Sequence, residues 1–332
     1  MNPTNSNWGG TLNRVRGLGQ AVSKPVSEAP MTPTCSAGGT LKSGGDGRNS
    51  VPDSLETSEF EFIRALMRSQ AGIVIDPRRK YLVESQLVGL IRREGIASLQ
   101  SLVGGMRANP GDSIEHKVID VLSPDETAFF RDPWHFDLLR TVILPAAIEA
   151  GRPERVLNLW CAATSTGQEA YSLLMLVQEH FPELLEWKLR LLATDLSFES
   201  LERARTGRYS LLEINRGLPA CLLVKHFMRQ GIEWEIAETL RHRVEFQRLN
   251  LVSEWGGLPL MGVVLLCNVL AHVDVTTEHK LLVRIRRFMR PGGMLLLGAN
   301  EVLRDSSDDF EPVTMNGTTY YRYRSTEPLG SA

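Results

Sequence analysis

The sequence predicts an α/β protein with a mostly parallel sheet, preceded by an all-α module. Three observations favour this fold. From residue 155 onward, short apolar runs alternate with segments of helix length, which indicates parallel strands covered by helices on both faces. Near the end, Asn316-Gly317 separates two strand-like runs and predicts an antiparallel hairpin at the sheet edge. Before residue 123, apolar residues recur at helical spacing without a strand signal.

Composition narrows the class of protein. The 332 residues suffice for two domains, and 42% are hydrophobic. A net charge of −2 does not favour a nucleic-acid binder. No apolar run is long enough for membrane insertion, and the N-terminus lacks a signal-peptide pattern, so we expect a cytoplasmic protein. The four cysteines lie far apart in the sequence and form no CxxC pair, so we expect neither a disulfide scaffold nor a metal site.

The domain prediction begins with two segments. Residues 1–55 are expected to be a disordered tail, because 30 of the first 50 residues are Gly, Ser, Thr, Asn, Pro or Asp. Residues 56–122 are expected to form a helical domain of four helices. Asp76 and Ser98 stand where they would cap two of these helices.

Residues 123–326 are predicted to form the α/β domain, and 327–332 a short tail. Strands are expected at 156–160, 189–194, 263–266 and 294–297, with the hairpin at 313–321. The segment 207–249 interrupts the alternation of strands and helices. Because it contains short β-like runs at 233–236 and 243–247, we interpret it as an inserted β-subdomain.

The loop after the first strand indicates the kind of ligand. A dinucleotide-binding loop needs several glycines near a pyrophosphate, whereas this loop has only Gly167, and Glu169 opens the next helix. A carboxylate there suits a cationic ligand without phosphate, such as S-adenosylmethionine. Asp195 ends the next strand, where an acid accepts hydrogen bonds from ribose hydroxyls. Two simpler interpretations stay open: Glu169 favours a helix N-terminus, and Asp195 serves as a cap.

Two strings carry a resemblance to a known family. They are Asp125-Glu126-Thr127-Ala128-Phe129-Phe130-Arg131 and Trp160-Cys161-Ala162-Ala163-Thr164-Ser165-Thr166-Gly167-Gln168-Glu169-Ala170-Tyr171-Ser172. Over residues 58–325 the chain resembles the chemotaxis receptor glutamate methyltransferases, the CheR family, which typically read N-x-T-x-F-F-R and W-S-A-x-x-S-T-G-E-E-P-Y-S. Further matches include Pro291-Gly292-Gly293 and Gly298 with Glu301. The resemblance implies a class I methyltransferase fold, a Rossmann-like parallel sheet with a C-terminal antiparallel hairpin.

The resemblance also implies the site. Carried over by position, the family's cofactor contacts fall on Asp125, Thr127, Arg131, Glu169, Asp195, Asn250, Leu251, Cys267 and Asn268. Arg131 would hold the substrate carboxylate near the methyl-transfer centre, because a guanidinium offers a carboxylate two parallel hydrogen bonds. His272 stands where the family has a tyrosine near the transferred methyl, and it would act as a polar lid or be simply solvated. Phe129 and Phe130 are expected to be core aromatics.

The function implied is methyl transfer from S-adenosylmethionine to glutamate carboxylates on the cytoplasmic helical bundle of a chemoreceptor-like protein, performed by a monomer. Lys80, Arg92 and Arg93 would face that bundle. Three departures from the family support an alternative, a degenerate member that binds the cofactor and acts by protein interaction. Asp125 replaces an asparagine, Cys267 an arginine and His272 a tyrosine. A nicotinamide oxidoreductase is disfavoured by the single-glycine loop.

Overall fold

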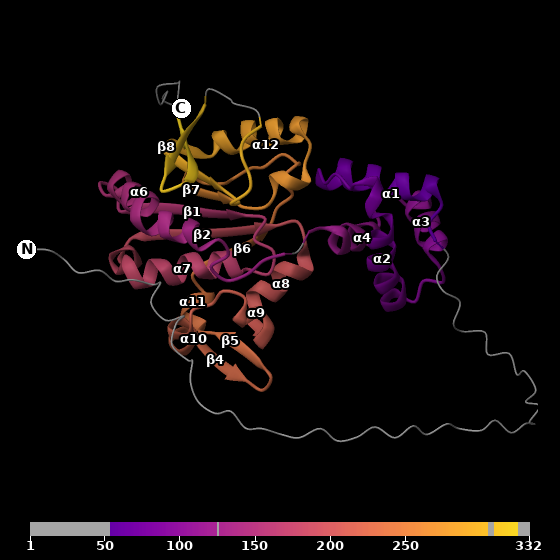
Figure 1. Ribbon diagram of the computed structural model, residues 1–332, viewed down its shortest axis with the longest axis horizontal. Helices are drawn as coiled ribbons and strands as arrows, with labels where there is room; N and C mark the ends of the chain where they lie inside the picture. Colours follow the sequence, from indigo (N-terminus) through magenta and orange to yellow (C-terminus); the bar gives the residue numbers. More distant parts are fainter. Residues whose placement is uncertain (1–53, 125, 305–308, 325–332) are drawn as a thin grey trace, which may run out of the picture. The chain divides into compact units, whose positions relative to one another are not determined.

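A seven-stranded sheet with the order β6-β2-β1-β7-β8-β10-β9 forms the centre of the protein (Figure 1). The structure is a computed structural model that describes residues 54–124, 126–304 and 309–324. Strands β6, β2, β1, β7 and β8 run parallel, and β10 is antiparallel to both β8 and β9. The strands are β1 (Val156–Ala162), β2 (Lys188–Asp195), β6 (Val244–Arg248), β7 (Met261–Leu266), β8 (Met289–Leu297), β9 (Phe310–Met315) and β10 (Thr318–Tyr323).

Both faces of the central strands are buried, as their continuous apolar sequences predicted. Successive residues of a strand point to opposite faces. Leu159 therefore packs in one core cluster with residues of α6 (Leu144–Gly151) and α7 (Gln168–His180), whereas Trp160 packs in another with residues of α12 (Val275–Arg287). Figure 1 shows α7 and α12 on opposite sides of the strands.

The first four helices of the described chain have a hydrophobic core of their own. They are α1 (Thr57–Ala71), α2 (Lys80–Glu94), α3 (Leu99–Ala108) and α4 (Ser113–Leu122), here called the helical module. Both predicted caps are present. The Ser98 hydroxyl accepts a hydrogen bond from the Ser101 N–H, and the Asp76 carboxylate caps a short turn, Pro77–Arg79, that leads into α2. None of the helices in the described part of the chain is both long and apolar enough to cross a bilayer.

Two strand predictions need correction. We assigned 243–247 to the inserted subdomain, but β6 pairs with β2 in the main sheet. As an edge strand, β6 buries Val244 and exposes its alternate residues, so its sequence reads like that of a hairpin strand. Strand β8 begins at Met289, before the Pro291-Gly292-Gly293 turn rather than after it. Met289 already pairs with Met261 of β7, and a bulge accommodates the turn.

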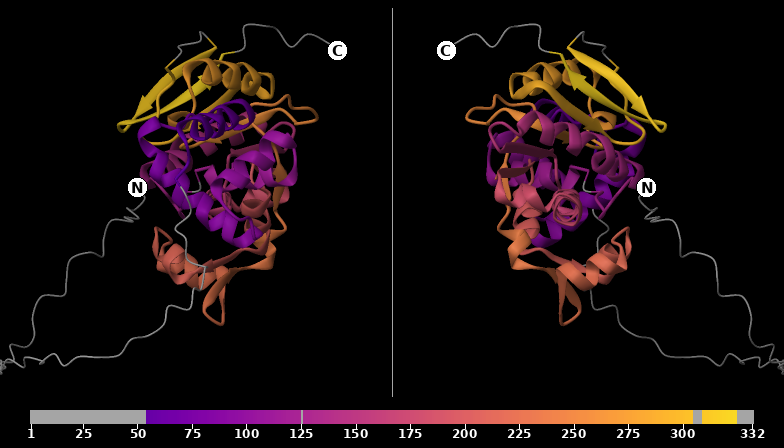
Figure 2. Two further views of the ribbon diagram at one scale, coloured as in Figure 1. Left: turned by 90° about the vertical axis from the view of Figure 1, so that its right-hand side faces the viewer. Right: turned by 90° about the vertical axis from the view of Figure 1, so that its left-hand side faces the viewer.

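The insertion forms a separate three-stranded sheet, in the order β3-β5-β4. Figure 2 shows its β4–β5 hairpin, in orange, projecting away from the main sheet. Its strands are β3 (Arg208–Ser210), β4 (Phe227–Gln230) and β5 (Glu233–Ile236). The remaining helices are α5 (Pro133–Leu138), a π-helical turn (Leu139–Ile143), α8 (Phe198–Thr206), α9 (Leu211–Asn215), α10 (Ala220–His226) and α11 (Glu238–Arg241), with short 3-10 turns at Pro182–Glu186 and Leu270–His272.

The helical module contacts the sheet-bearing part through the end of α1. Arg68 pairs with Asp274 at 2.6 Å, and the Gln70 carbonyl accepts a hydrogen bond of 2.6 Å from the Asn250 amide. Ile73 forms an isolated antiparallel bridge with Val273. Between these contacts, Gly72 turns the chain with a φ of 72°. A β-carbon there would lie 2.6 Å from Cγ1 of Val252, so the close approach requires glycine.

We expect Gly72→Ala to lower the free energy of unfolding more than Gly95→Ala, a matched control. Both glycines end helices with left-handed backbone, φ 72° and 67°, so both substitutions carry the cost of that conformation, about 1–2 kcal/mol. Only at Gly72 does the new methyl group also meet neighbouring atoms, because nothing lies within 4 Å at Gly95. Urea unfolding followed by circular dichroism measures both values. Equal losses would contradict the tight packing at Gly72.

Candidate functional site

The loops at the carboxyl ends of β1 and β7 have unusual backbone conformations. Ala163, Ser165 and Asn268 have φ values of 60°, 52° and 61°, in a region that non-glycine residues rarely adopt. Such residues cluster at functional sites because the surrounding structure must hold them there. In α/β proteins with parallel sheets, ligands bind at this edge. These backbone conformations therefore occur in two of the loops in which the sequence predicted site residues, the loops after β1 and β7.

Asp195 connects the loop after β1 to the segment that leads from β2 into α8. One carboxylate oxygen accepts a 2.7 Å hydrogen bond from the Ser165 N–H in the loop after β1, and the other accepts a 2.9 Å bond from the Ser197 N–H. The hydroxyl of Ser197 caps α8. Asp195, for which we left a capping role open, instead accepts a hydrogen bond from the N–H of this capping residue. The Asp195 carboxylate thus fixes the loop that leads to Glu169.

Glu169 lies in the first turn of α7, deep among protein atoms, and keeps some accessible surface. Burial raises the pKa of its carboxyl group to about 7, although the thiols of Cys267 and Cys161 act as hydrogen-bonding partners and Arg131 provides a positive charge. An acid that is destabilised in this way gains most from a bound cation. The site therefore fits the ammonium group of S-adenosylmethionine.

The two thiols beside Glu169 are neutral at physiological pH. Burial raises the pKa of Cys161 and of Cys267 well above the usual range, and the neighbouring Glu169 charge adds to the effect. A thiol carries no positive charge, so Cys267 cannot replace the charge of the arginine that the family has at this position. Burial outweighs the two thiol hydrogen bonds and the Arg131 charge, which leaves Glu169 only partly ionised near neutral pH.

A small cavity of about 20 Å³ opens beside Glu169. Its polar lining consists of Arg131, Asp132, His135, Glu169, Cys267 and Asn268. Four of these six were predicted from the sequence. The cavity is far smaller than a cofactor.

Arg131 reaches the cavity from a segment that is anchored to α7. The Phe130 N–H donates to the Ser172 hydroxyl at 2.9 Å, and that hydroxyl donates to the Gln168 carbonyl. Phe129 is buried edge-on against Tyr209, with ring centroids 4.9 Å apart, which confirms it as a core aromatic. Phe130 is partly buried and packs on Phe136 instead.

His272 lies on the loop after β7, close to the helical module. Its backbone carbonyl accepts a 2.8 Å hydrogen bond from the Val74 N–H. Burial lowers the pKa of its imidazole; Arg79 lowers it further, whereas Glu301 and Glu126 raise it. The imidazole is therefore mostly neutral at pH 7. His272 is half-buried rather than fully solvated, and it lies beside positive and negative groups from three segments.

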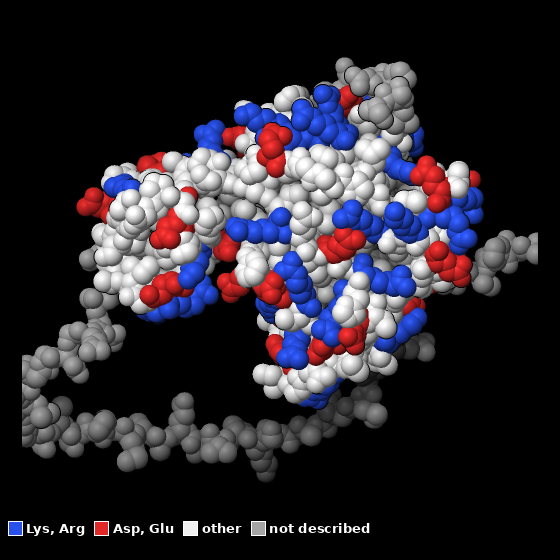
Figure 3. Space-filling model, turned by 180° about the vertical axis from the view of Figure 1, so that it is seen from behind, with Lys and Arg blue, Asp and Glu red and all other residues white. Residues whose placement is uncertain are grey.

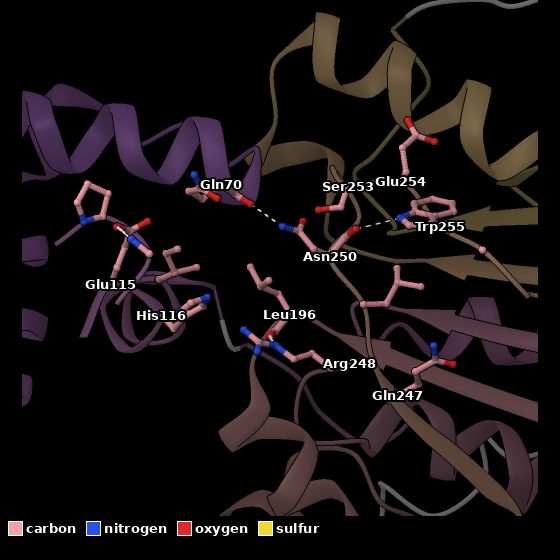
Figure 4. A pocket seen from close by; sticks show the side chains of 15 residues that line it. Gln70, Glu115, His116, Leu196, Gln247, Arg248, Asn250, Ser253, Glu254 and Trp255 are labelled. Atoms are coloured by element: carbon pink, nitrogen blue, oxygen red, sulfur yellow. Dashed lines mark hydrogen bonds between the residues drawn. The ribbon is translucent and has the colours of Figure 1, made fainter. Parts of the chain in front are cut away.

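Asn250 lies at a second, larger cavity of about 660 Å³ (Figure 4). Its amide donates to the Gln70 carbonyl, its side-chain oxygen accepts from the Val252 N–H, and its carbonyl accepts from the Trp255 indole. Gln70, His116 and Arg248 contribute to the same wall. Asn250 thus connects the loop after β6 to the helical module, and its side chain does not line the Glu169 cavity.

The structure brings together part of the predicted set. Arg131, Glu169, Cys267 and Asn268 share the small cavity, and Asn250 borders the large one, whereas Thr127, Asp195, Leu251 and His272 line neither. Leu251 packs against the core beneath α12. Asp125 lies outside the described residues.

Two cavity residues were missed from the sequence. His135 is buried at the start of α5, with its Nδ1 atom 3.9 Å from an oxygen of Asp132, and burial lowers the pKa of the imidazole. Asp132 directly follows Arg131 and His135 lies four positions after it, and Asp132-Pro133 is a helix-start signal that could have placed them beside Arg131. Among the described residues, no group of three or more His, Cys, Asp or Glu side chains could hold a metal ion.

Comparisons with known proteins match both the helical module and the sheet-bearing part of the chain. Residues 125–319 match the family described as "CheR methyltransferase, SAM binding domain", and residues 58–121 match "CheR methyltransferase, all-alpha domain". The chain is 35% identical over 274 residues to chemotaxis protein methyltransferase 1 of Pseudomonas aeruginosa, covering 81% of this chain and 99% of that protein.

Two further relatives are similar over nearly their full lengths. Chemotaxis protein methyltransferase Cher2 of Pseudomonas putida is 33% identical, covering 80% of this chain and 97% of that protein. Chemotaxis protein methyltransferase of Vibrio parahaemolyticus is 30% identical, covering 81% and 98%. Because the two family matches extend through the helical module and the sheet in the order that the resemblance predicted, the chain belongs to the CheR family of S-adenosylmethionine-binding methyltransferases.

Proposed function

We propose that this protein transfers a methyl group from S-adenosylmethionine to glutamate side chains of a cytoplasmic, helical, chemoreceptor-like protein. One observation carries the proposal: Glu169 and Arg131 line the same cavity. A buried carboxylate suits a cationic cofactor, and a guanidinium suits a carboxylate acceptor. The cavity thus combines two groups whose charges match the two reactants of this transfer.

For the cofactor we propose the residues implied by the family. Glu169 would pair with the ammonium group and Asp195 with the ribose hydroxyls. The family positions Asn268, Cys267, Thr127, Asn250, Leu251 and Asp125 would supply further contacts, and of these Asn268 and Cys267 line the Glu169 cavity. When bound, S-adenosylmethionine supplies an electrophilic methyl group on a sulfonium. Burial keeps this region of low polarity, which strengthens each charge interaction within it.

For the acceptor we propose that Arg131 orients the carboxylate. A glutamate with a pKa of about 4.3 is ionised at neutral pH, so the attacking oxygen needs no general base. The protein then has to hold the carboxylate and the methyl group in the right geometry, and such positioning can lower a reaction barrier by roughly 7–11 kcal/mol. His272, mostly neutral, would close one side of the site and help to exclude water.

The start of α2 is our proposed docking site for the partner. Tyr81 is 72% exposed and Leu82 is 41% exposed, next to the exposed Arg78 and Arg79. Arg79 is close enough to influence the pKa of His272, so a helix bound here would lie near that residue. Of the basic residues that we expected to face the partner, Lys80 pairs with Glu84 and Arg93 with Glu199. Figure 3 shows both signs of charge interspersed over one face of the molecule.

The direct test is transfer of radiolabelled methyl groups from S-adenosylmethionine to purified cytoplasmic fragments of candidate receptors. Glutamate methyl esters hydrolyse in mild alkali and release methanol, whereas N-methyl groups do not. We expect alkali-labile label on receptor fragments and none on fragments whose acceptor glutamates are changed to alanine. Alkali-stable label would contradict the proposed acceptor chemistry.

Cofactor affinity should fall as the pH drops below 7. The Glu169 pKa of about 7 means that half of the carboxylate is already protonated at pH 7, and roughly nine-tenths at pH 6. We therefore expect S-adenosylhomocysteine to bind about fivefold more weakly at pH 6 than at pH 7, measured by calorimetry. In Glu169→Gln, binding should be weaker and nearly independent of pH over this range. A native protein with constant affinity would contradict the proposed pairing.

Arg131→Lys should reduce kcat/KM for the acceptor by about 10- to 100-fold. The lysine keeps the charge but loses the two parallel hydrogen bonds, which are worth roughly 1.5–3 kcal/mol to a charged partner. The measurement is the initial rate of methyl transfer at saturating cofactor. Arg140→Lys is the matched control, because Arg140 pairs with Asp137 and does not line the cavity. An equal loss in both variants would count against a role in acceptor binding.

The second candidate function is cofactor binding without turnover. It is favoured by the neutral Cys267 thiol, which leaves the cavity without the family's arginine charge. Tight binding of S-adenosylhomocysteine with no methyl transfer to any receptor fragment would support it. In that case Asp125→Asn combined with Cys267→Arg should create activity, whereas activity in the native protein would exclude this candidate.

A further inference from the structure

The carboxylate of Glu301, which follows β8, holds the loop after β7 by its backbone. One oxygen accepts hydrogen bonds from the Asn268 N–H at 2.7 Å and the Gly298 N–H at 2.9 Å. The other oxygen accepts from the Ala271 N–H at 3.0 Å. The three donors therefore converge on one ionisable side chain that lines neither cavity.

This contact holds a left-handed backbone conformation. Asn268 has a φ of 61°, a region that is uncommon for residues other than glycine and that asparagine adopts more readily than most. Gly298 allows the close approach, because a β-carbon there would lie 2.8 Å from the Asn268 nitrogen and 2.9 Å from a Glu301 oxygen. Hydrogen bonds to a charged acceptor are the strong ones, so the carboxylate provides a large share of the restraint.

Arg304 holds the same loop by its carbonyl groups. Its guanidinium donates to the Leu270 and Val273 carbonyls, each at 2.9 Å, and pairs with the buried Glu278 of α12. Glu301 thus accepts hydrogen bonds from N–H groups of the turn that contains His272, and Arg304 donates hydrogen bonds to C=O groups of the same turn. The loop is restrained from both sides by residues only three positions apart.

We propose that Glu301 is a positioning residue that sets the geometry of Asn268 and His272 for methyl transfer. The inference rests on the proposed function for what these two side chains face. It adds a residue that contacts neither reactant and acts only through the loop. The Glu301 charge also raises the pKa of His272, against the effects of burial and Arg79, so it influences that imidazole electrostatically as well.

The experiment compares Glu301→Gln and Glu301→Ala with a control, Glu311→Gln. Glu311 lies on β9 and pairs with Arg324, so the control also removes one paired carboxylate. Glutamine keeps one acceptor oxygen but places an NH2 group where the second oxygen was, so one backbone N–H loses its partner. We expect kcat for methyl transfer to fall about 10- to 100-fold in the alanine variant and less in the glutamine variant. The Kd for S-adenosylhomocysteine should rise several-fold, and the control should match the native protein.

Two NMR readouts separate positioning from general destabilisation, and neither needs activity. In Glu301→Gln the amide signals of Asn268, Gly298 and Ala271 should shift upfield, and the titration midpoint of His272 should move to lower pH. Unchanged amide signals and an unchanged His272 midpoint would overturn the proposal, as would native kcat and KM in both variants. If the native protein showed no methyl transfer, the proposed function would fail, while the NMR readouts would still decide whether Glu301 holds the loop.

Discussion

The candidate site is arranged around the desolvated carboxyl group of Glu169. Glu169 lies at the edge of a sheet whose strands are buried on both faces, so its charge has few water molecules to stabilise it. The surrounding structure supplies two neutral thiols and the Arg131 guanidinium as partial compensation. The hydrogen bonds of Asp195, the anchored segment around Phe130 and the restrained loop after β7 all keep these groups beside it.

The site is built in two layers that obey different physical constraints. The inner layer consists of side chains that line the small cavity. The outer layer works mainly through backbone groups: Glu301 and Arg304 restrain one loop, and Asp195 restrains another.

Periodicity alone predicted most of the fold, because burial on both faces leaves a clear apolar signature in β1, β2 and β7. It was wrong for β6, whose alternate residues face solvent at the sheet edge. For the site, local motifs identified Arg131 and Glu169, since each lies in a distinctive string. His135 and Asp132 were missed because what places them in the cavity is the turn after Arg131, where Asp132 has a φ of 57°. The role of Glu301 depends on contacts 30 and 33 residues away along the chain, which no local pattern contains.

The bridge between Ile73 and Val273 has an evolutionary consequence. Because main-chain atoms form this link, along with the hydrogen bond from Val74 to His272, the connection does not depend on which side chains occupy those positions. Substitutions on the exposed surface of the helical module can therefore leave its junction to the loop after β7 intact. Under the proposed function, a chain built in this way can change the partner that it recognises without changing the loop that contains His272.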